Sequence, residues 1–153
     1  MHLPPSAWGP FFWHTIHIVA LGYPTNPSYG HKKAAKDFYE SLIFLIPCPI
    51  CREHYKEHLH NSAISPNLDR RDDLFRWTVE LHNKVNEKLG KPRISEAEAI
   101  TYYSRLGNRG RSPVYTPDDF AEADLRAMIR GIGLGVGISA SVAAAIWWIS
   151  KSE

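Results

Sequence analysis

The sequence predicts an all-α protein: a four-helix bundle with a short fifth helix, followed by a C-terminal transmembrane helix. Two observations lead to this fold class. Apolar residues recur at helical spacing through residues 10–106, and no stretch alternates polar and apolar residues as a strand would. Residues 131–149, in contrast, contain no charged side chain. We therefore expect a folded domain at residues 1–106, a linker with a short helix at 107–130, a transmembrane anchor at 131–149 and a short tail at 150–153.

The composition limits the classes of protein to which the chain can belong. Its 153 residues suffice for one domain with an appendage, and 22% charged against 44% apolar residues argues against general disorder. The net charge of +2 gives no electrostatic support for a nucleic-acid partner. Two cysteines exclude a small secreted fold stapled by several disulfides. Five Trp, seven Tyr and six Phe favour a rich core or a planar ligand.

The first two helices are predicted from apolar stripes and from the residues that interrupt them. The first helix ends near Gly22, before the turn-rich residues 23–27, and its apolar face contains Trp13, Ile16, His17 and Ala20. The second helix covers residues 28–45 and is stopped by Pro47, and its stripe contains Phe38, Leu42 and Leu45. Each helix is thus expected to bury one side.

The next three helices are predicted mainly from the residues at their ends. The third starts at Cys48, with Pro49 at the first helical position, and continues to about Leu59. The fourth is capped by Asp69 and ends at Gly90, and its buried stripe contains Leu74, Trp77, Leu81, Val85 and Leu89. The fifth opens with Ser95 and Glu98 as a capping box and continues through about Leu106.

The C-terminal region reads as a linker followed by a membrane span. Residues 107–117 contain two Gly and two Pro, and Asp118 and Asp119 open a short helix. As a helix, residues 131–149 would be roughly 28 Å long, close to the roughly 30 Å hydrocarbon core of a bilayer. Trp147 and Trp148 lie at the far end, where indole rings prefer the membrane interface. The alternative is a buried core helix, which is disfavoured because clustered glycines weaken a water-soluble helix.

The charges beside the span predict its orientation. The N-terminus lacks the basic start and long apolar run of a secretory signal, so the anchor is expected at the C-terminus. Arg126 and Arg130 precede the span, and only Lys151 follows it. Because positive charges favour the cytosolic side, the main domain is expected in the cytosol.

Cys48 and Cys51 form a CxxC motif for which three interpretations compete. A c-type haem site needs His directly after the second cysteine, but that residue is Arg52. A zinc site could add His54 or His58, but Cys48 and His58 would lie about 15 Å apart along one helix, so a second chain would have to contribute. A redox dithiol is favoured, because both cysteines would lie at the positive end of the helix dipole, which stabilises thiolate.

Two further groups of side chains suit a large planar ligand that carries phosphates. Trp13 and His17 lie one helical turn apart, and the fourth helix adds His82, Asn83, Asn86 and Lys88. Rings can stack on such a ligand, carboxamides can bind base edges and an ammonium can bind pyrophosphate. Each group taken alone also fits an ordinary core histidine or a solvated helix face.

Taken together, these motifs resemble those of the Erv/ALR family of FAD-linked sulfhydryl oxidases. The similarity covers about residues 8–103, and both order and spacing fit: Trp8-Gly9, Trp13 with His17, Tyr23-Pro24, Pro47 to Cys51, Arg76-Trp77 and the run HNKVNEKLGKP from His82. The resemblance implies a small helical bundle, often a homodimer, with FAD at the bundle mouth against the CxxC helix. Residues 1–106 are then expected to form an FAD-binding sulfhydryl oxidase domain.

The resemblance also implies a role for each matching residue. Cys51 would lie against the flavin and pass electrons to it, and Cys48 would exchange with the dithiol of a substrate protein. The cofactor would be bound by Gly9, Trp13, His17, His82, Asn83, Val85, Asn86, Lys88 and Tyr103. Molecular oxygen would be the final acceptor, giving hydrogen peroxide, and no metal is expected.

The chain also departs from the family pattern. Many relatives have a further structural disulfide, but the aligned positions here are Val79 and about Glu96, and no third cysteine is present for a shuttle pair. Substrate dithiols are therefore expected to reach Cys48 directly or through a separate protein. This reduced set looks like that of the oxidases of large cytoplasmic DNA viruses, which is consistent with a host membrane or a virion. Two alternatives stay open: a zinc-stabilised, non-enzymatic membrane adaptor, and a structural membrane protein that kept the bundle but lost turnover.

Overall fold

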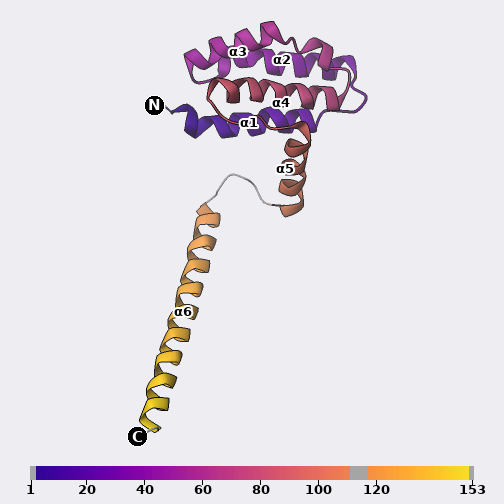
Figure 1. Ribbon diagram of the computed structural model, residues 1–153. Coiled ribbons are helices and arrows are strands. Elements are labelled where there is room, and N and C mark those ends of the chain that lie inside the picture. The colour runs from indigo at the N-terminus through magenta and orange to yellow at the C-terminus, as the bar shows by residue number, and fades with distance from the viewer. Residues whose placement is uncertain (1–2, 111–116, 152–153) are drawn as a thin grey trace. The chain divides into compact units, whose positions relative to one another are not determined.

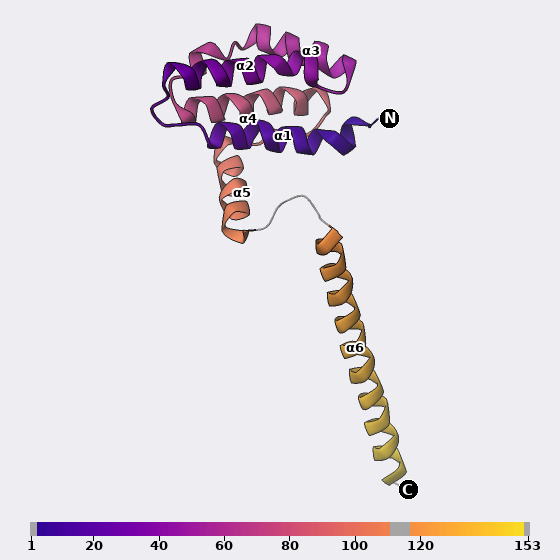
Figure 2. The same cartoon turned by 180° about the vertical axis from the view of Figure 1, so that it is seen from behind.

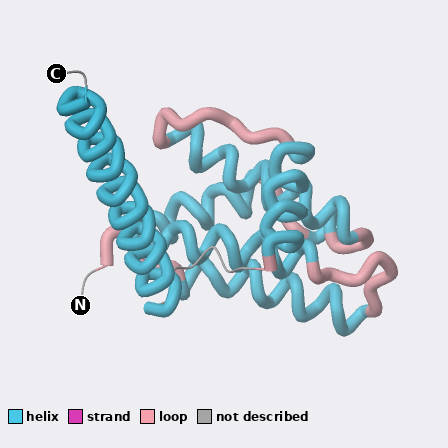
Figure 3. The backbone as a smooth tube through the Cα atoms, turned by 90° about the horizontal axis from the view of Figure 1, so that it is seen from below, coloured by secondary structure: helices cyan, strands magenta, loops and turns pink. Residues whose placement is uncertain are grey.

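The computed structural model describes residues 3–110 and 117–151, and within them the chain forms six α-helices and one short 3₁₀ helix. These are α1 (Pro5–Leu21), α2 (Tyr29–Leu45), α3 (Pro49–Asn61), the 3₁₀ helix η1 (Ser65–Asn67), α4 (Arg71–Lys88), α5 (Glu96–Arg109) and α6 (Pro117–Lys151). No strand occurs in these residues, and Figure 3 shows only helices and loops. The predicted all-α class is confirmed.

The first four helices form the predicted bundle. α1 packs against α4, α2 packs against α3, and the two pairs lie against each other (Figures 1 and 2). α5 follows α4 and runs across the direction of the four bundle helices (Figure 1). The centre of the core is formed by Ile16, Tyr39, Leu42, Leu74, Trp77 and Leu81.

Buried aromatic side chains connect the helices through hydrogen bonds to the backbone. The Tyr39 hydroxyl donates to the Ile16 carbonyl at 2.9 Å, and the Tyr55 hydroxyl donates to the Tyr39 carbonyl at 2.9 Å. The Trp77 indole N–H donates to the Ser62 carbonyl at 3.0 Å, and its ring packs edge-on against Tyr39. A buried polar group without a partner costs about 1–3 kcal/mol, so these bonds favour one register between the helices.

Most of the predicted helix ends are confirmed. They are Gly22 at the end of α1, Ser28 at the start of α2, Cys48 with Pro49 at the start of α3, and Ser95 with Glu98 at the start of α5. Gly90 follows α4 with a φ of 64°, in the left-handed region that favours glycine. These ends are set by residues within a few positions of each other, which is why sequence reasoning locates them.

Three predictions about capping and burial are wrong. Asp69 does not cap α4, because the N-cap is the next residue, and the Asp69 carboxylate pairs with Lys32 of α2 instead. Leu45 is 63% exposed, because the backbone leaves the helical conformation at Ile46 and that residue enters the core. Leu89 is 62% exposed, since it lies at the C-cap, beyond the last turn of α4.

The end of the bundle and the start of the C-terminal region differ from the predicted boundaries. α5 continues past Leu106 to Arg109, so the first residues of the expected linker are helical. The rest of its Gly- and Pro-rich part, residues 111–116, and the tail residues 152–153 lie outside the described residues. The chain divides into two compact units, Met1–Ser104 and Arg105–Glu153.

The C-terminal unit is dominated by one long helix. The short helix expected from Asp118 and Asp119 and the apolar run are both part of α6, which is 35 residues long. Within the part of the chain that the structure describes, one helical segment is long and apolar enough to cross a membrane, Asp124–Lys151, with a mean hydropathy of 1.8. At about 1.5 Å per residue, its 28 residues extend roughly 42 Å, more than a bilayer core requires.

Candidate functional site

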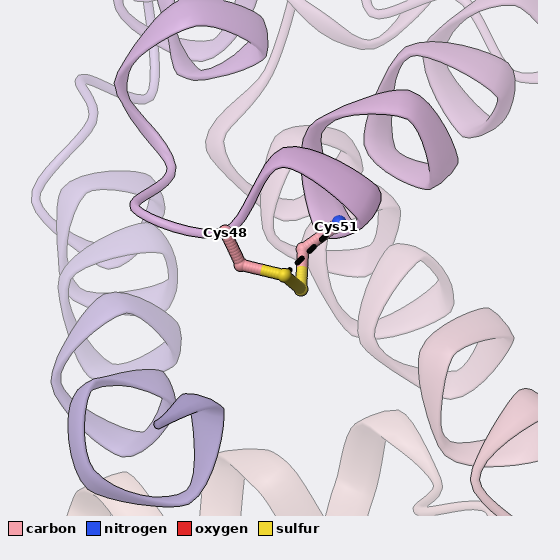
Figure 4. Close-up of a disulfide and its surroundings, with 2 residues drawn as sticks. All are labelled: Cys48 and Cys51. Carbon is pink, nitrogen blue, oxygen red and sulfur yellow. Dashed lines mark hydrogen bonds between the residues drawn. A yellow bond between two sulfur atoms is a disulfide. The ribbon is translucent and has the colours of Figure 1, made fainter. Parts of the chain in front are cut away.

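The two cysteines form a disulfide at the N-terminus of α3. Cys48 is the N-cap and Pro49 the first helical residue, so the disulfide joins the end of the preceding loop to Cys51 in the first turn of the helix (Figure 4). The backbone N–H of Cys51 donates to Cys48 Sγ at 3.3 Å. The helix dipole and this N–H both favour negative charge on sulfur, which is the form that exchanges disulfides.

A large cavity opens beside the disulfide. Its volume is about 1170 Å³, above the roughly 300–1,000 Å³ of most small-molecule sites. Cys51 lines this cavity, whereas Cys48 does not. The structure also brings together around it every residue that the sequence analysis predicts for the cofactor: Gly9, Trp13, His17, His82, Asn83, Val85, Asn86, Lys88 and Tyr103.

One wall of the cavity is a stack of aromatic rings from α1 and α4. The Trp13 and His82 rings stack with centroids 3.9 Å apart and planes 5° apart, and His17 lies beside both. Burial, together with His82 and His14, lowers the pKa of His17 to about 3. Burial and Lys91 lower the pKa of His82 to about 4. Both imidazoles are therefore neutral at pH 7, and they act as flat rings and hydrogen-bonding groups, without a positive charge.

The two asparagines predicted for the cofactor differ in what they already bind. The Asn83 carboxamide accepts from the Ile94 N–H at 2.9 Å and donates to the Ile94 carbonyl at 2.8 Å. It thereby clamps the segment that leads into α5. Asn86 is 6% exposed and lines the cavity, but its side chain makes no hydrogen bond to the described residues. Asn86 thus has both its donor and its acceptor available for a ligand.

Lys88 and Gly9 lie at two other points of the cavity wall. The Lys88 ammonium contacts the Glu57 carboxylate of α3 at 2.9 Å, in a pair open to solvent. A Cβ at Gly9 would meet no protein atom within 4 Å, so the packing of the bundle does not require glycine there. Lack of a side chain at this position keeps that part of the cavity open.

Two residues that line the cavity, Trp8 and His58, are not among the side chains predicted to bind the cofactor. The Trp8 Nε1 and His58 Nε2 atoms are buried and have no hydrogen-bond partner in the described residues, and both residues line the cavity. His58 follows Cys51 by seven residues, two helical turns, so helical spacing places it on the same face of α3. That spacing could have revealed it. Trp8 belongs to the Trp8-Gly9 motif shared with the family, but its burial depends on packing against Phe12 and the rest of the core.

The zinc interpretation gains no support from the geometry. Within the described residues, no group of three or more His, Cys, Asp or Glu side chains could hold a metal ion. Cys48 and Cys51 are joined to each other, and a disulfide offers no thiolate ligands.

The sequence model of the Erv1/Alr family matches residues 10–104, which contain the whole bundle after the start of α1. The chain belongs to the Erv1/Alr family. Solved structures of one protein, yeast Erv1, share the helical core described above.

Two viral relatives are among the similar proteins. A protein of Acanthamoeba polyphaga mimivirus, named a probable FAD-linked sulfhydryl oxidase, is 37% identical over 99 residues, 64% of this chain and 69% of its own length. The FAD-linked sulfhydryl oxidase of African swine fever virus is 33% identical over 98 residues, 64% of this chain and 81% of its own.

The crystal structure of the yeast Erv1 core is similar in fold. It has 32% identity and a TM-score of 0.58, covering 62% of this chain and 79% of the yeast chain. The crystal structure of the FAD binding domain of Erv1 from Saccharomyces cerevisiae gives 33% identity and a TM-score of 0.58 over 61% of this chain and 88% of that chain.

Proposed function

We propose that this family member is a FAD-linked sulfhydryl oxidase that forms disulfides in substrate proteins. One observation carries the proposal: the Cys48–Cys51 disulfide stands in the wall of the cavity, with Cys51 on the cavity side and Cys48 outside the lining. A dithiol substrate can then approach one sulfur while a cofactor contacts the other. The names of the two viral relatives support the same activity.

The proposed exchange uses the disulfide as a two-electron acceptor. A substrate thiolate attacks Cys48 Sγ, the Cys48–Cys51 bond breaks, and Cys51 leaves as the thiolate. The second substrate thiolate then attacks its partner sulfur in the mixed disulfide and releases Cys48. The substrate is oxidised to a disulfide, and the two electrons reside on the reduced cysteine pair. The N-terminus of α3 assists both departures, because it stabilises the thiolates that leave.

The residues around the cavity fit FAD. The buried Trp8 indole N–H and the buried His58 Nε2 have no hydrogen-bond partner among the described residues and can bind polar atoms of the cofactor, and the Trp13–His82 stack offers a flat apolar surface. FAD is proposed to be held by Gly9, Trp13, His17, His82, Asn83, Val85, Asn86, Lys88 and Tyr103. When bound, FAD would take the two electrons from the cysteine pair and deliver them to molecular oxygen, giving hydrogen peroxide.

A visible absorption spectrum tests the proposal directly. The full chain, purified in detergent, is expected to be yellow, to bleach when dithiothreitol is added under argon, and to regain its colour in air. A colourless protein would contradict FAD binding. A coloured protein that dithiothreitol does not bleach would indicate a bundle that has lost turnover.

Serine variants of the two cysteines separate their proposed roles. Cys51→Ser is expected to keep the flavin bound and abolish bleaching by dithiol. Cys48→Ser is expected to block exchange with a protein dithiol and leave the oxidised flavin spectrum unchanged. Equal oxygen consumption by wild type and Cys51→Ser would refute the assignment of Cys51.

We further propose that the catalytic domain, residues 1–106, is joined through residues 107–130 to a membrane anchor at 131–149. The apolar composition of Asp124–Lys151 supports the anchor. Arg126 and Arg130 before the span, against Lys151 after it, support a cytosolic catalytic domain. A homodimer, and a host or virion membrane as the location of the anchor, complete the proposal.

A further inference from the structure

Thr78 of α4 lies at the start of a chain of hydrogen bonds that crosses to α1 and returns. It is fully buried, and its Oγ1 lies 2.7 Å from the Phe75 carbonyl oxygen and 2.9 Å from His17 Nδ1. The other nitrogen of that ring, His17 Nε2, lies 3.1 Å from His82 Nδ1. α1 and α4 lie side by side (Figure 1), and one helical turn separates Thr78 from His82.

The position of the Thr78 hydroxyl proton determines which atom donates in each of these hydrogen bonds. A hydroxyl has one proton, and two oxygen acceptors would not approach to 2.7 Å without a proton between them. The Thr78 hydroxyl therefore donates to the Phe75 carbonyl, and its oxygen accepts from His17 Nδ1–H. In the reverse arrangement, the lone pairs of the two oxygen atoms would face each other at that distance.

The remaining protons follow in sequence. His17 is neutral, because burial lowers its pKa to about 3, so with Nδ1 protonated its Nε2 carries a lone pair. His82 Nδ1 must then hold the proton that lies between the two rings. His82 is also neutral, with a pKa lowered to about 4, so its Nε2 carries a lone pair as well. This atom makes no hydrogen bond to the described residues, and His82 lines the cavity.

We infer that Thr78 is a positioning residue of the cofactor site, whose hydroxyl fixes the tautomers of His17 and His82 so that His82 Nε2 faces the cavity as a hydrogen-bond acceptor. The ligand group that matches an acceptor is an N–H or O–H, such as the amino and hydroxyl groups of FAD. The identity of this ligand rests on the proposed function, whereas the tautomers do not. Stacking against Trp13 holds the His82 ring in its plane, so the acceptor has a fixed direction.

Nitrogen-15 NMR of the histidine side chains tests the inference without an activity measurement. The full chain, labelled with ¹⁵N-histidine, is measured at pH 7 with FAD bound and again after its removal, with signals assigned through His17→Gln and His82→Gln. Nδ1–H tautomers are expected for both residues in the wild type. An Nε2–H tautomer at His82 would overturn the inference.

Two substitutions at Thr78 provide the matched comparison. Thr78→Ser keeps the hydroxyl, so both tautomers and the affinity for FAD should stay within about twofold of wild type. Thr78→Val removes the hydroxyl, so the histidine signals should shift toward mixed tautomers. FAD binding should weaken roughly fivefold, which is the loss in affinity expected when one neutral hydrogen bond is removed.

Unchanged tautomers in Thr78→Val would overturn the positioning role, and shifted tautomers with unchanged FAD affinity would overturn the link to the cofactor. If Thr78→Val does not fold, the wild-type tautomers and Thr78→Ser still decide the matter. If wild type binds no flavin, the proposed function fails, and the tautomers alone still test the hydrogen-bond chain.

Discussion

Replacing Asn83 by alanine removes both hydrogen bonds that clamp Ile94 to α4. Asn83 is 2% exposed, and each bond contributes roughly 1 kcal/mol net. Ile94 is partly exposed, so water can replace part of what its backbone loses. We therefore expect Asn83→Ala to lower the free energy of unfolding by about 2 kcal/mol. For a domain of this size, that loss lowers the melting temperature by roughly 8–16 °C.

Asn86→Ala provides a matched control, because it removes the same side chain one turn later on the same helix. The Asn86 side chain makes no hydrogen bond to the described residues, so we expect this substitution to change stability by less than about 1 kcal/mol. Its effect should fall on the cofactor, with weaker FAD binding. The two variants thus separate a cavity residue whose carboxamide also holds the segment before α5 from one whose carboxamide binds no group of the described residues.

Urea unfolding of the cofactor-free full chain, followed by near-ultraviolet circular dichroism, measures both losses. Bound FAD must be absent, because a ligand adds its own stabilisation to the native state. Equal losses for Asn83→Ala and Asn86→Ala would refute the reasoning. If Asn83→Ala lowers the free energy of unfolding only slightly, water fully replaces the two hydrogen bonds between Asn83 and Ile94.

Three further predictions address pH, charge and the anchor. Lowering the pH from 7 to 5 should reduce the free energy of unfolding by about 2 kcal/mol through His17. Its pKa of about 3 in the folded state lies below the ordinary histidine value of 6.5, so the unfolded state takes up the proton first. A thermal melt of His17→Gln with an unchanged pH slope would contradict this. Glu57→Gln frees the Lys88 ammonium and should tighten FAD binding about two- to threefold, as measured by titration. Stability should change little because the ion pair is exposed. Weaker FAD binding by this variant would argue against Lys88 as a phosphate contact. Deleting residues 131–153 should move the protein to the soluble fraction with its dithiol-dependent oxygen consumption intact, and a truncated protein that stays in the membrane would contradict the anchor.

The sequence alone is enough to predict structural features that depend on residues close together in the chain. Pro49 after Cys48 sets the start of α3, and Ser95 with Glu98 sets the start of α5, because a cap is made by side chains within one turn of the backbone they bind. The spacing of Trp13 with His17 and of the residues after His82 reflects the helical period. For the same reason, the sequence identifies a group of side chains that the bundle brings to one cavity.

Only the tertiary structure distinguishes what each of these side chains does. His17 contacts Thr78 and His82, which lie 61 and 65 residues further along the sequence. The Asn83 carboxamide binds the Ile94 backbone, whereas the Asn86 carboxamide, one turn away, is available to a ligand. These contacts depend on how α1, α4 and the start of α5 pack, and no local spacing encodes them. Packing between separate helices also decides two other features. It buries Trp8, and it places Cys51, but not Cys48, in the lining of the cavity.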